Sequence, residues 1–384
     1  MGRERSVSQV GSRGVPDGRG GVERVLEAVS PRLADRGIDT TVWCSWNRSR
    51  PGSWRGVRLA YAPSVPSKHF DTFVRSALAV ACECVRGSSV IHIHASGSAP
   101  LALIARLFGK KVVVTVHGAD WKRRKWGRAG RWFLRFGEWA AVRFPHRTVA
   151  VSEGLARALE DAYGRPVDYI PNGVEDRRPR PADRIGEFGL RGDDYLLYLA
   201  RLVPEKQPHV LIEAFKALSD RHGMRLVIAG PAWHSADYSE HLRRLAGDDP
   251  DIVFTGEVDE ELLEELYSNC AAFVLPSEVE GMSLSLLDAM AFGACTVSSD
   301  IPANVAVVAD AGRSFRVGDA AHLASVLEEL LDDPEQMKAL RIAARTRITT
   351  DFTWDAVADR WVALYEELLG EHRLDASRQD RIAA

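Results

Sequence analysis

The sequence alternates between short apolar runs rich in β-branched residues and longer segments with helical spacing, such as 22–36, 208–218 and 260–269. Apolar runs of this kind are typical of parallel strands buried on both faces, and their alternation with helices favours a doubly wound sheet. The runs fall into two series, one at Val90–Ala95, Lys111–Gly118, Arg147–Ser152 and Val167–Gly173, the other at Tyr195–Leu202, Arg225–Gly230, Asp251–Gly256, Ala271–Pro276 and Cys295–Asp300. The pattern therefore predicts an α/β protein with two sheets.

Between the two series lies a segment, Glu175–Asp194, that is rich in charge, proline and glycine and has no periodicity. Such a composition is typical of a domain boundary. We therefore expect one Rossmann-like domain over residues 1–180 and a second over 190–350, followed by a final helix over 351–372. The chain has 384 residues, enough for two domains of ordinary size.

The composition argues against several classes of protein. Hydrophobic residues make up 46% of the chain and charged residues 27%, a balance typical of globular proteins. The net charge of −3 does not favour nucleic-acid binding, and no apolar run reaches the ~18 residues of a membrane span. The N-terminus lacks the apolar core of a secretory signal, and five scattered cysteines are expected to be free thiols. We therefore expect a cytoplasmic protein.

The segment from Ser277 to Gly293, SEVEGMSLSLLDAMAFG, has the clearest binding signature. Glu280 lies in a glycine-containing loop after an apolar run, and Asp288 follows eight residues later in a predicted helix. A strand, a loop and a helix in this order form the usual ligand site of open α/β sheets. The acids suit hydroxyl groups, and an anion suits the backbone N–H groups at the helix start, those of Met282, Ser283 and Leu284. This combination predicts a nucleotide-sugar, and the lack of a Walker lysine argues against a nucleotide hydrolase.

The same segment resembles the E-x7-E motif of retaining GT-B glycosyltransferases, in particular those of family 4. The resemblance implies that Glu280 contacts the donor sugar and that Asp288, one methylene shorter than the family's glutamate, contacts the ribose. It also implies the GT-B architecture, in which two Rossmann-like domains face each other across a cleft and a final helix crosses back to the first domain. A structural alternative is that Ser285 and Asp288 form an S-x-x-D pattern in which Asp288 only caps the helix.

A pair of cations follows the first strand of the second series, in the sequence ARLVPEKQP. Arg201 and Lys206 precede Pro208, which is well suited to begin a helix. A guanidinium and an ammonium beside a helix start suit a pyrophosphate. The pair resembles the R-x4-K pair of family 4, which implies that it stabilises the departing nucleoside diphosphate. The alternative is a surface loop that happens to be basic.

Gly20 and Gly21 precede the helical segment 22–36. Adjacent glycines let a phosphate or an acceptor approach a helix start closely, although a flexible turn explains them equally well. The family carries a similar glycine pair after its first strand. Here that strand would be Ser6–Val10, which is short and polar.

His117 ends the most apolar run of the first series, and VTVHG resembles the active-site histidine segment of the family. The resemblance places His117 near the reacting carbon of the donor, where it can donate a hydrogen bond to a hydroxyl. His92 and His94 alternate along the preceding run and should share one face. Because no third ligand follows nearby, and the family needs no ion in the protein, we expect no metal and no cofactor. Asn172, in a PNGV turn, is expected to be structural with a contact to the cleft.

The segment Trp121–Arg147 carries nine basic residues and one acid. Trp132, Phe136, Trp139 and Arg143 recur at helical spacing, so the aromatic rings should share a face. One interpretation is a helix that turns this face to the core and its basic side to solvent. A second is attraction to anionic lipid or to a phosphate-bearing acceptor, and nucleic acid is a third that no recognised motif supports.

These features together predict a retaining, metal-independent glycosyltransferase that moves a hexose from a nucleoside diphosphate sugar, expected to be a UDP sugar, to an acceptor hydroxyl. The acceptor would be a small molecule, a glycan or a lipid-linked molecule, and the enzyme would lie in the cytoplasm or at the inner face of the membrane. No nucleic-acid partner is expected. The alternative is a non-catalytic module that binds membranes or polyanions on the same scaffold, since a fold alone does not fix a function.

Overall fold

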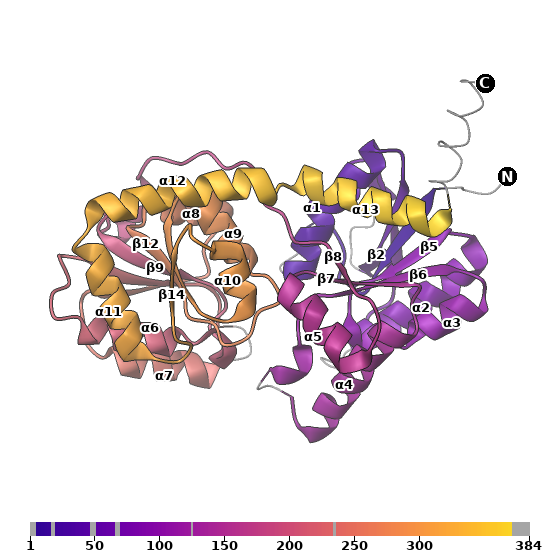
Figure 1. Ribbon diagram of the computed structural model, residues 1–384, viewed down its shortest axis with the longest axis horizontal. Helices are drawn as coiled ribbons and strands as arrows, with labels where there is room; N and C mark the ends of the chain where they lie inside the picture. Colours follow the sequence, from indigo (N-terminus) through magenta and orange to yellow (C-terminus); the bar gives the residue numbers. More distant parts are fainter. Residues whose placement is uncertain are drawn as a thin grey trace. The chain divides into compact units, whose positions relative to one another are not determined.

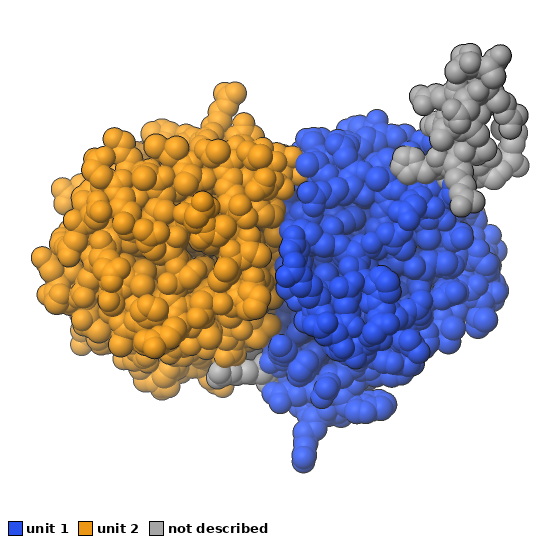
Figure 2. Space-filling model, in the orientation of Figure 1, with its two compact units in different colours: residues 1–173, 354–384 blue, residues 174–353 orange. Residues whose placement is uncertain are grey.

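The computed structural model describes residues 5–16, 20–46, 51–65, 70–123, 126–232 and 236–370. The chain forms two compact units, unit 1 with residues 1–173 and 354–384, and unit 2 with residues 174–353 (Figure 2). Each unit is built on one largely parallel sheet, which confirms the predicted fold class. No helix within the described ranges is both long enough and apolar enough to cross a membrane.

Unit 1 contains an eight-stranded sheet with the strand order β3-β4-β2-β1-β5-β6-β7-β8. All neighbours pair in parallel except β3 and β4. The strands are β1 (Ser6–Val10), β2 (Asp39–Ser45), β3 (Ser53–Trp54), β4 (Val57–Ala62), β5 (Val90–Ile93), β6 (Lys111–Val116), β7 (Arg147–Ala150) and β8 (Asp168–Tyr169). The predicted run 167–173 is thus reduced to a two-residue edge strand, since Pro171 and the Asn-Gly turn follow at once.

Helices cover both faces of this sheet, with α1 and α13 on one side and α2 to α5 on the other (Figure 1). The helices are α1 (Gly21–Asp35), α2 (Asp71–Arg86), α3 (Leu101–Leu107), α4 (Arg128–Arg143), α5 (Glu153–Tyr163) and α13 (Trp354–Leu369), with short 3₁₀ turns η1 (Ser96–Ser98) and η2 (Asp120–Lys122). Helix α13 packs along α1, where Arg36 pairs with Asp359 at 2.6 Å. The C-terminal helix therefore belongs to the same unit as the N-terminal strand.

The polar strand β1 lies in the middle of the sheet, between β2 and β5, which confirms the strand predicted at Ser6–Val10. All five of its residues are buried. The strand tolerates burial because its polar groups are paired: Ser8 Oγ lies 2.8 Å from Ser88 Oγ, and Gln9 Oε1 lies 2.6 Å from His94 Nε2.

Unit 2 contains a six-stranded, all-parallel sheet with the order β11-β10-β9-β12-β13-β14. The strands are β9 (Tyr195–Leu199), β10 (Arg225–Ala229), β11 (Ile252–Gly256), β12 (Ala272–Leu275), β13 (Cys295–Ser299) and β14 (Arg313–Phe315). The helices are α6 (Pro208–Ala217), α7 (Ala236–Ala246), α8 (Glu260–Asn269), α9 (Leu284–Ala291), α10 (Pro302–Val308), α11 (Ala320–Leu331) and α12 (Pro334–Asp351), with 3₁₀ turns η3 (Arg184–Phe188) and η4 (Pro204–Lys206).

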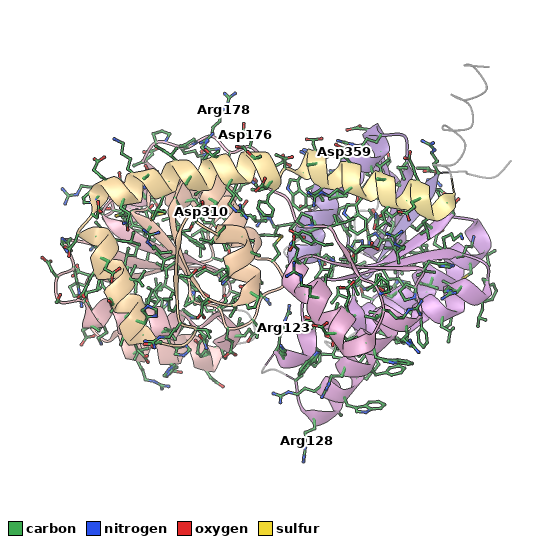
Figure 3. All side chains as sticks on the ribbon, viewed as in Figure 1. Arg123, Arg128, Asp176, Arg178, Asp310 and Asp359 are labelled. Atoms are coloured by element: carbon green, nitrogen blue, oxygen red, sulfur yellow. The ribbon has the colours of Figure 1, made fainter. Side chains whose placement is uncertain are left out.

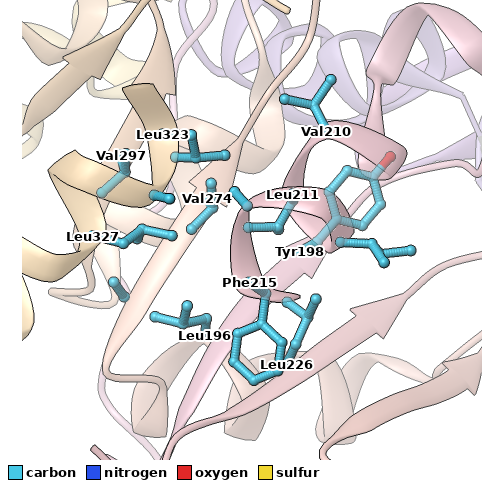
Figure 4. Close-up of a cluster of buried hydrophobic side chains, with 14 of the residues drawn as sticks. Leu196, Tyr198, Val210, Leu211, Phe215, Leu226, Val274, Val297, Leu323 and Leu327 are labelled. Atoms are coloured by element: carbon cyan, nitrogen blue, oxygen red, sulfur yellow. The ribbon is translucent and has the colours of Figure 1, made fainter. Parts of the chain in front are cut away.

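The core of unit 2 forms where α6, α7 and α11 pack on one face of the sheet (Figure 4). Phe215 of α6 and Leu327 of α11 meet the strand residues Leu196, Leu226 and Val274 there. The charged segment that separates the two predicted series packs on α8, because Arg177 and Arg180 both pair with Glu264. This segment is therefore an ordered part of unit 2.

Candidate functional site

In unit 2, two loops meet at the carboxyl edge of the sheet. Strands β9 and β12 pair in parallel, so the loops that follow them, 200–207 and 276–283, leave the sheet side by side. The backbone N–H of Glu278 donates to Glu205 O at 3.0 Å, and Gln207 Nε2 donates to Glu278 Oε2 at 3.0 Å. These bonds hold the two loops together, so residues 74 positions apart in the chain come into contact.

The centre of this site is an ion pair between Lys206 Nζ and Glu280 Oε1. The side chains are only 14% and 10% exposed. Lys206 ends η4, and Gln207 then adopts a left-handed conformation with φ of 50° before α6 begins. This sharp turn directs the ammonium group toward the loop that carries Glu280. The structure thus brings together two residues for which the sequence predicted separate contacts, one with phosphate and one with sugar.

Arg201 is the exposed cation of the same loop. Its backbone carbonyl accepts a hydrogen bond from the Tyr198 hydroxyl at 3.0 Å, whereas its guanidinium makes no hydrogen bond or ion pair with the residues that the structure describes. Gly230, which directly follows the neighbouring strand β10, shapes this loop: it has a φ of 134°, and a Cβ there would lie 2.1 Å from Ala200 O. Sequence reasoning did not single out Gly230, although a glycine directly after an apolar strand was a usable signal.

Helix α9 begins at the predicted position, and Ser283 is its N-cap. The Ser283 hydroxyl accepts from Leu286 N at 3.4 Å and lies 2.9 Å from Ser285 Oγ. Within the described chain, the backbone N–H groups of Ser283 and Leu284 donate to no protein acceptor, as expected at a helix start.

Asp288 is 3% exposed and lies in the body of α9, five residues after its cap. The alternative in which Asp288 caps the helix is therefore wrong. The N-cap Ser283 lies two residues before Ser285, so the S-x-x-D spacing falls inside the helix. Met282, the third predicted N–H donor, is buried at 7% exposure beside the cap.

Two buried histidines, His92 and His94, and the half-buried His117 lie at the carboxyl edge of the unit 1 sheet. His92 in β5 and His94, the residue that follows this strand, lie on the same side with ring centroids 3.9 Å apart, which confirms the predicted alternation. His117 follows β6, and its Nε2 lies 3.1 Å from His94 Nδ1. Burial lowers the pKa of His117 to about 4 and holds the pKa values of His92 and His94 well below their usual range. All three rings are therefore neutral at pH 7.

The histidines bond to one another and to their neighbours, so their spacing does not create a metal site. Within the described ranges, no group of three or more histidine, cysteine, aspartate or glutamate side chains is arranged to hold an ion. The metal-free expectation nevertheless stays a prediction, to be tested with a chelator.

Gly20 is the extended N-cap of α1, and Gly21 is the first residue of that helix. Glu23 reaches back over the helix start, where its Oε1 accepts from Arg13 N at 2.8 Å. A Cβ at Gly20 would lie 2.1 Å from Glu23 Oε2. The carboxylate of Glu23 thus lies at the start of α1, where the sequence predicted a phosphate or an acceptor. The neighbouring residues 17–19 lie outside the described residues.

Asn172 is 5% exposed and lies in unit 1, as do His117, Gly20 and Gly21. The next residue, Gly173, packs so closely on α13 that a Cβ there would lie 2.8 Å from the ring of Trp354. The turn therefore needs its glycine to accommodate the C-terminal helix, which fits the structural role expected of this motif.

Helix α4 turns its aromatic residues outward. Trp132 is 71% exposed, and the rings of Trp132, Phe136 and Trp139 stack in succession along the helix. The interpretation in which this face packs on the core is wrong. The core side instead carries Leu134, Glu138 and Val142 with one glycine and two alanines, and a Cβ at Gly137 would lie 2.4 Å from Ser96 O, so no side chain fits at that position. Two of the preceding basic residues, Arg124 and Lys125, lie outside the described residues.

The sequence matches two family models in succession. The model Glycosyltransferase Family 4 matches residues 19–178, and the model Glycosyl transferases group 1 matches residues 185–347. The first match covers most of the N-terminal part of unit 1, and the second covers most of unit 2.

Several curated proteins are similar over most of the chain. The D-inositol 3-phosphate glycosyltransferase of Acidothermus cellulolyticus is 27% identical, over 94% of this chain and 88% of the relative. The glycogen synthase of Mycobacterium tuberculosis is 30% identical, over 72% of this chain and 68% of the relative. A GDP-mannose-dependent alpha-(1-6)-phosphatidylinositol monomannoside mannosyltransferase of the same species is 28% identical, over 89% and 94%.

Solved structures match the whole fold. Sucrose-phosphate synthase from Thermosynechococcus elongatus superposes with a TM-score of 0.82 at 21% identity, over 95% of this chain and 99% of that one. Anabaena HepE, in a complex with UDP and glucose, superposes with a TM-score of 0.78 at 17% identity, over 94% of this chain and 100% of that one. At these identities the likeness shows the fold, which is GT-B.

Proposed function

Because this chain belongs to glycosyltransferase family 4 and uses a nucleotide-sugar, we propose that it transfers a hexose from a UDP sugar to an acceptor hydroxyl with retention at the reacting carbon. The observation that carries this proposal is the Lys206–Glu280 pair at the carboxyl edge of the unit 2 sheet, in the same loop as Arg201, whose guanidinium has no partner among the described residues. Cations and a carboxylate at the ends of adjacent parallel strands suit a ligand that combines phosphate with hydroxyl groups.

The proposed roles follow from charge and position. Arg201 and Lys206 bind the diphosphate and stabilise its charge as it leaves, and the backbone N–H groups at the start of α9 add two donors. Glu280 accepts from a sugar hydroxyl, and Lys206 limits the repulsion between this carboxylate and the phosphates. Asp288 contacts the ribose. No protein base is assigned, because the departing phosphate can take the acceptor proton.

The identity of the donor is the finer part of the proposal. A UDP sugar is supported by the fold shared with HepE, which was solved with UDP and glucose. GDP-mannose is the competing donor, since one relative is described as GDP-mannose-dependent. Thermal unfolding with a panel of UDP and GDP sugars distinguishes them. A ligand at about a hundred times its dissociation constant stabilises the folded protein by about 2.7 kcal/mol.

The expected result is a clear rise in unfolding temperature with at least one UDP sugar and a smaller rise with GDP sugars. A larger rise in unfolding temperature with GDP-mannose would show that the donor is a GDP sugar, and the proposed site would stand. No rise with any sugar nucleotide would contradict the proposed function. Arg201→Ala should abolish the rise, and the exposed Arg178→Ala in the same unit is the matched control.

We also propose that the enzyme works in the cytoplasm at an anionic membrane surface. The aromatic rings of α4 are exposed and lie among basic residues, and Arg128 projects outward at the start of this helix (Figure 3). Leu107 and Phe108, at the end of α3 on the same side of the sheet, are 78% and 64% exposed. Basic residues around an exposed apolar surface are typical of proteins that bind anionic lipid. A lipid-linked acceptor would be reached from such a surface.

A further inference from the structure

The histidines of unit 1 form part of a longer hydrogen-bonded chain that four separate elements supply. Its members are Tyr365 of α13, Gln9 of β1, His92 of β5, Thr115 of β6, and His94 and His117, which directly follow β5 and β6. Gln9 Nε2 lies 3.4 Å from the Tyr365 hydroxyl, and Gln9 Oε1 lies 2.6 Å from His94 Nε2. His94 Nδ1 then lies 3.1 Å from His117 Nε2. The chain therefore connects the C-terminal helix to the proposed active-site histidine.

The two distances at Gln9 fix the orientation of its amide. A separation of 2.6 Å from His94 Nε2 suits an oxygen acceptor and is too short for a contact between two nitrogens. With the amide turned over, an O–H···O bond to Tyr365 would have to span 3.4 Å, beyond its normal range of about 2.5–3.0 Å. Gln9 therefore presents its carbonyl oxygen to His94 and its NH₂ group to Tyr365.

The orientation of Gln9 determines the proton positions along the rest of the chain. Because the Gln9 oxygen only accepts, His94 must carry its proton on Nε2. A neutral His94 then has a lone pair on Nδ1, so His117 must donate to it through Nε2–H. Neutrality is expected because His94 is 4% exposed and burial disfavours its charged form.

The branch through Tyr365 agrees with this direction. The Tyr365 hydroxyl accepts from Gln9 and is 2.7 Å from His92 Nδ1, to which it donates. His92 then donates from Nε2 to Thr115 Oγ1 at 2.7 Å. In this arrangement each contact of the chain pairs one donor with one acceptor, as expected in a buried polar network.

We propose that Tyr365, Gln9 and His94 are positioning residues that hold His117 in its Nε2–H form, so that His117 offers its Nδ1 lone pair as an acceptor to a substrate hydroxyl. Within the described chain, no protein donor bonds to His117 Nδ1. His117 would thus receive a hydrogen bond from the substrate, whereas the sequence suggested that it donates one. The contact of His117 with a substrate rests on the proposed function, but the positions of the protons on His94 and His117 do not.

The direct test is long-range ¹H–¹⁵N correlation NMR on the full-length protein labelled with ¹⁵N-histidine, without substrate, at pH 7. His117→Gln assigns the signals of that ring. The expected result is that His94 and His117 both carry their proton on Nε2, with an unprotonated Nδ1. A His117 ring protonated on Nδ1, or an equal mixture of the two forms, would overturn the proposal without any activity measurement.

Variants test whether the chain holds this form. Gln9→Met removes the acceptor for His94 at similar volume and should produce a mixture of proton positions at His117. It should also lower kcat/KM about tenfold, the effect of losing one oriented hydrogen bond. Tyr365→Phe removes only a hydroxyl and should have a smaller effect of the same kind. Unchanged proton positions and kcat/KM in Gln9→Met would refute the positioning role.

Tyr163→Phe is the matched control, because it removes a tyrosine hydroxyl of the same unit that is 2.8 Å from Glu138 Oε1, outside the chain. It should leave the His117 signals unchanged, and a shift as large as that in Tyr365→Phe would count against the proposal. Failure of every sugar nucleotide to raise the unfolding temperature would contradict the proposed function alone, since the NMR result does not depend on a donor.

Discussion

The Lys206 ammonium has two candidate partners, the carboxylate of Glu280 and the phosphate of a donor. Arg201, by contrast, is exposed and forms no ion pair among the described residues. The two cations therefore differ in what their removal should do. Loss of Arg201 affects only the ligand, whereas loss of Lys206 also affects the folded protein.

For Arg201→Ala we expect turnover to fall about a hundredfold, the usual effect of removing one preorganised group that stabilises charge in the transition state. The unfolding temperature without ligand should not change, because the side chain is exposed. Initial rates with the donor found in the thermal panel provide the measurement, and Arg178→Ala is the control. Wild-type turnover in Arg201→Ala would remove this residue from the site.

For Lys206→Met we expect a similar loss of turnover together with a loss of stability. The carboxylate of Glu280, only 10% exposed, would lose its partner, which should cost about 1–3 kcal/mol in the free energy of unfolding. Urea unfolding is the measurement. The double variant Lys206→Met with Glu280→Gln should regain most of the loss, since no buried charge then remains unpaired. Equal stability of the wild type and Lys206→Met would mean that the ion pair contributes nothing.

The sequence predicted where these residues lie in the fold better than how their side chains contact one another. A motif at the end of a strand placed Glu280 and Lys206 at the same sheet edge, because parallel strands end together. Their direct contact depends on the left-handed turn at Gln207 and on the bond from Glu278 to Glu205, which no residue pattern revealed. The same holds for His117, whose bond to His94 depends on the register of β5 and β6.

At the scale of elements, α4 shows that helical periodicity predicts which residues share a face of a helix, but not whether that face turns to the core or to solvent. Its aromatic residues share one side as expected, yet that side is exposed, and on the core side the close approach of Gly137 to Ser96 leaves no room for a side chain at position 137. Strand β1 shows the reverse problem. Its polar residues looked unsuited to a sheet centre, and they are buried there because partners distant in the sequence satisfy them.

The histidine chain predicts how the stability of unit 1 depends on pH. The folded pKa values of His92, His94 and His117 lie below 6.5, so the unfolded chain binds more protons between these values. Stability is therefore fully present above pH 6.5 and is lost as the pH falls, through pH 4 in the case of His117. Each histidine adds a slope of up to about 1.4 kcal/mol per pH unit in that window.

Urea unfolding at pH 7.5, 6.5 and 5.5 tests this expectation before most carboxylates begin to titrate. The free energy of unfolding should fall between the last two values and change little between the first two. His92→Gln should make the decrease in the free energy of unfolding between pH 6.5 and 5.5 smaller, by the contribution of one histidine. His241→Gln, at an exposed position of α7, should leave this decrease unchanged. A flat profile from pH 7.5 to 5.5 would show that the three rings are not buried in the neutral form.

At the scale of the whole molecule, the alternation of strands and helices was sufficient to predict two parallel sheets, because only buried strands produce continuous apolar runs between helices. The assignment of the C-terminal helix to unit 1 came from family resemblance and not from composition. The structure adds the physical reason, since Tyr365 contacts Gln9 across 356 positions of sequence and α13 packs along α1.

Chelation tests the role of cations in the complete enzyme. If Arg201 and Lys206 supply the charge that a divalent ion supplies elsewhere, activity should be unchanged in millimolar EDTA. The measurement is the initial rate before and after dialysis against the chelator, and then with Mg²⁺ or Mn²⁺ added back. Loss of activity that an ion restores would show that a metal takes part in binding the diphosphate.

The last prediction concerns membrane association of the intact protein. The variant changes Arg128, Arg131, Trp132 and Trp139 to serine, which removes two charges and two exposed rings from α4. Each basic residue near an anionic surface contributes about 1 kcal/mol, so binding to acidic vesicles should fall steeply in the variant and, for the wild type, with added salt. Sedimentation with vesicles of acidic and of neutral lipid is the measurement.

The controls separate lipid binding from donor binding. Donor-induced thermal stabilisation should persist in the α4 variant, because the proposed contacts of Arg201, Lys206 and Glu280 with the donor lie in unit 2. Arg178→Ser removes an exposed charge of unit 2 and should sediment like the wild type. Equal sedimentation of the α4 variant and the wild type would exclude this face from membrane binding. Equal wild-type binding to acidic and neutral vesicles would show that the exposed rings, and not the arginines, determine the attachment.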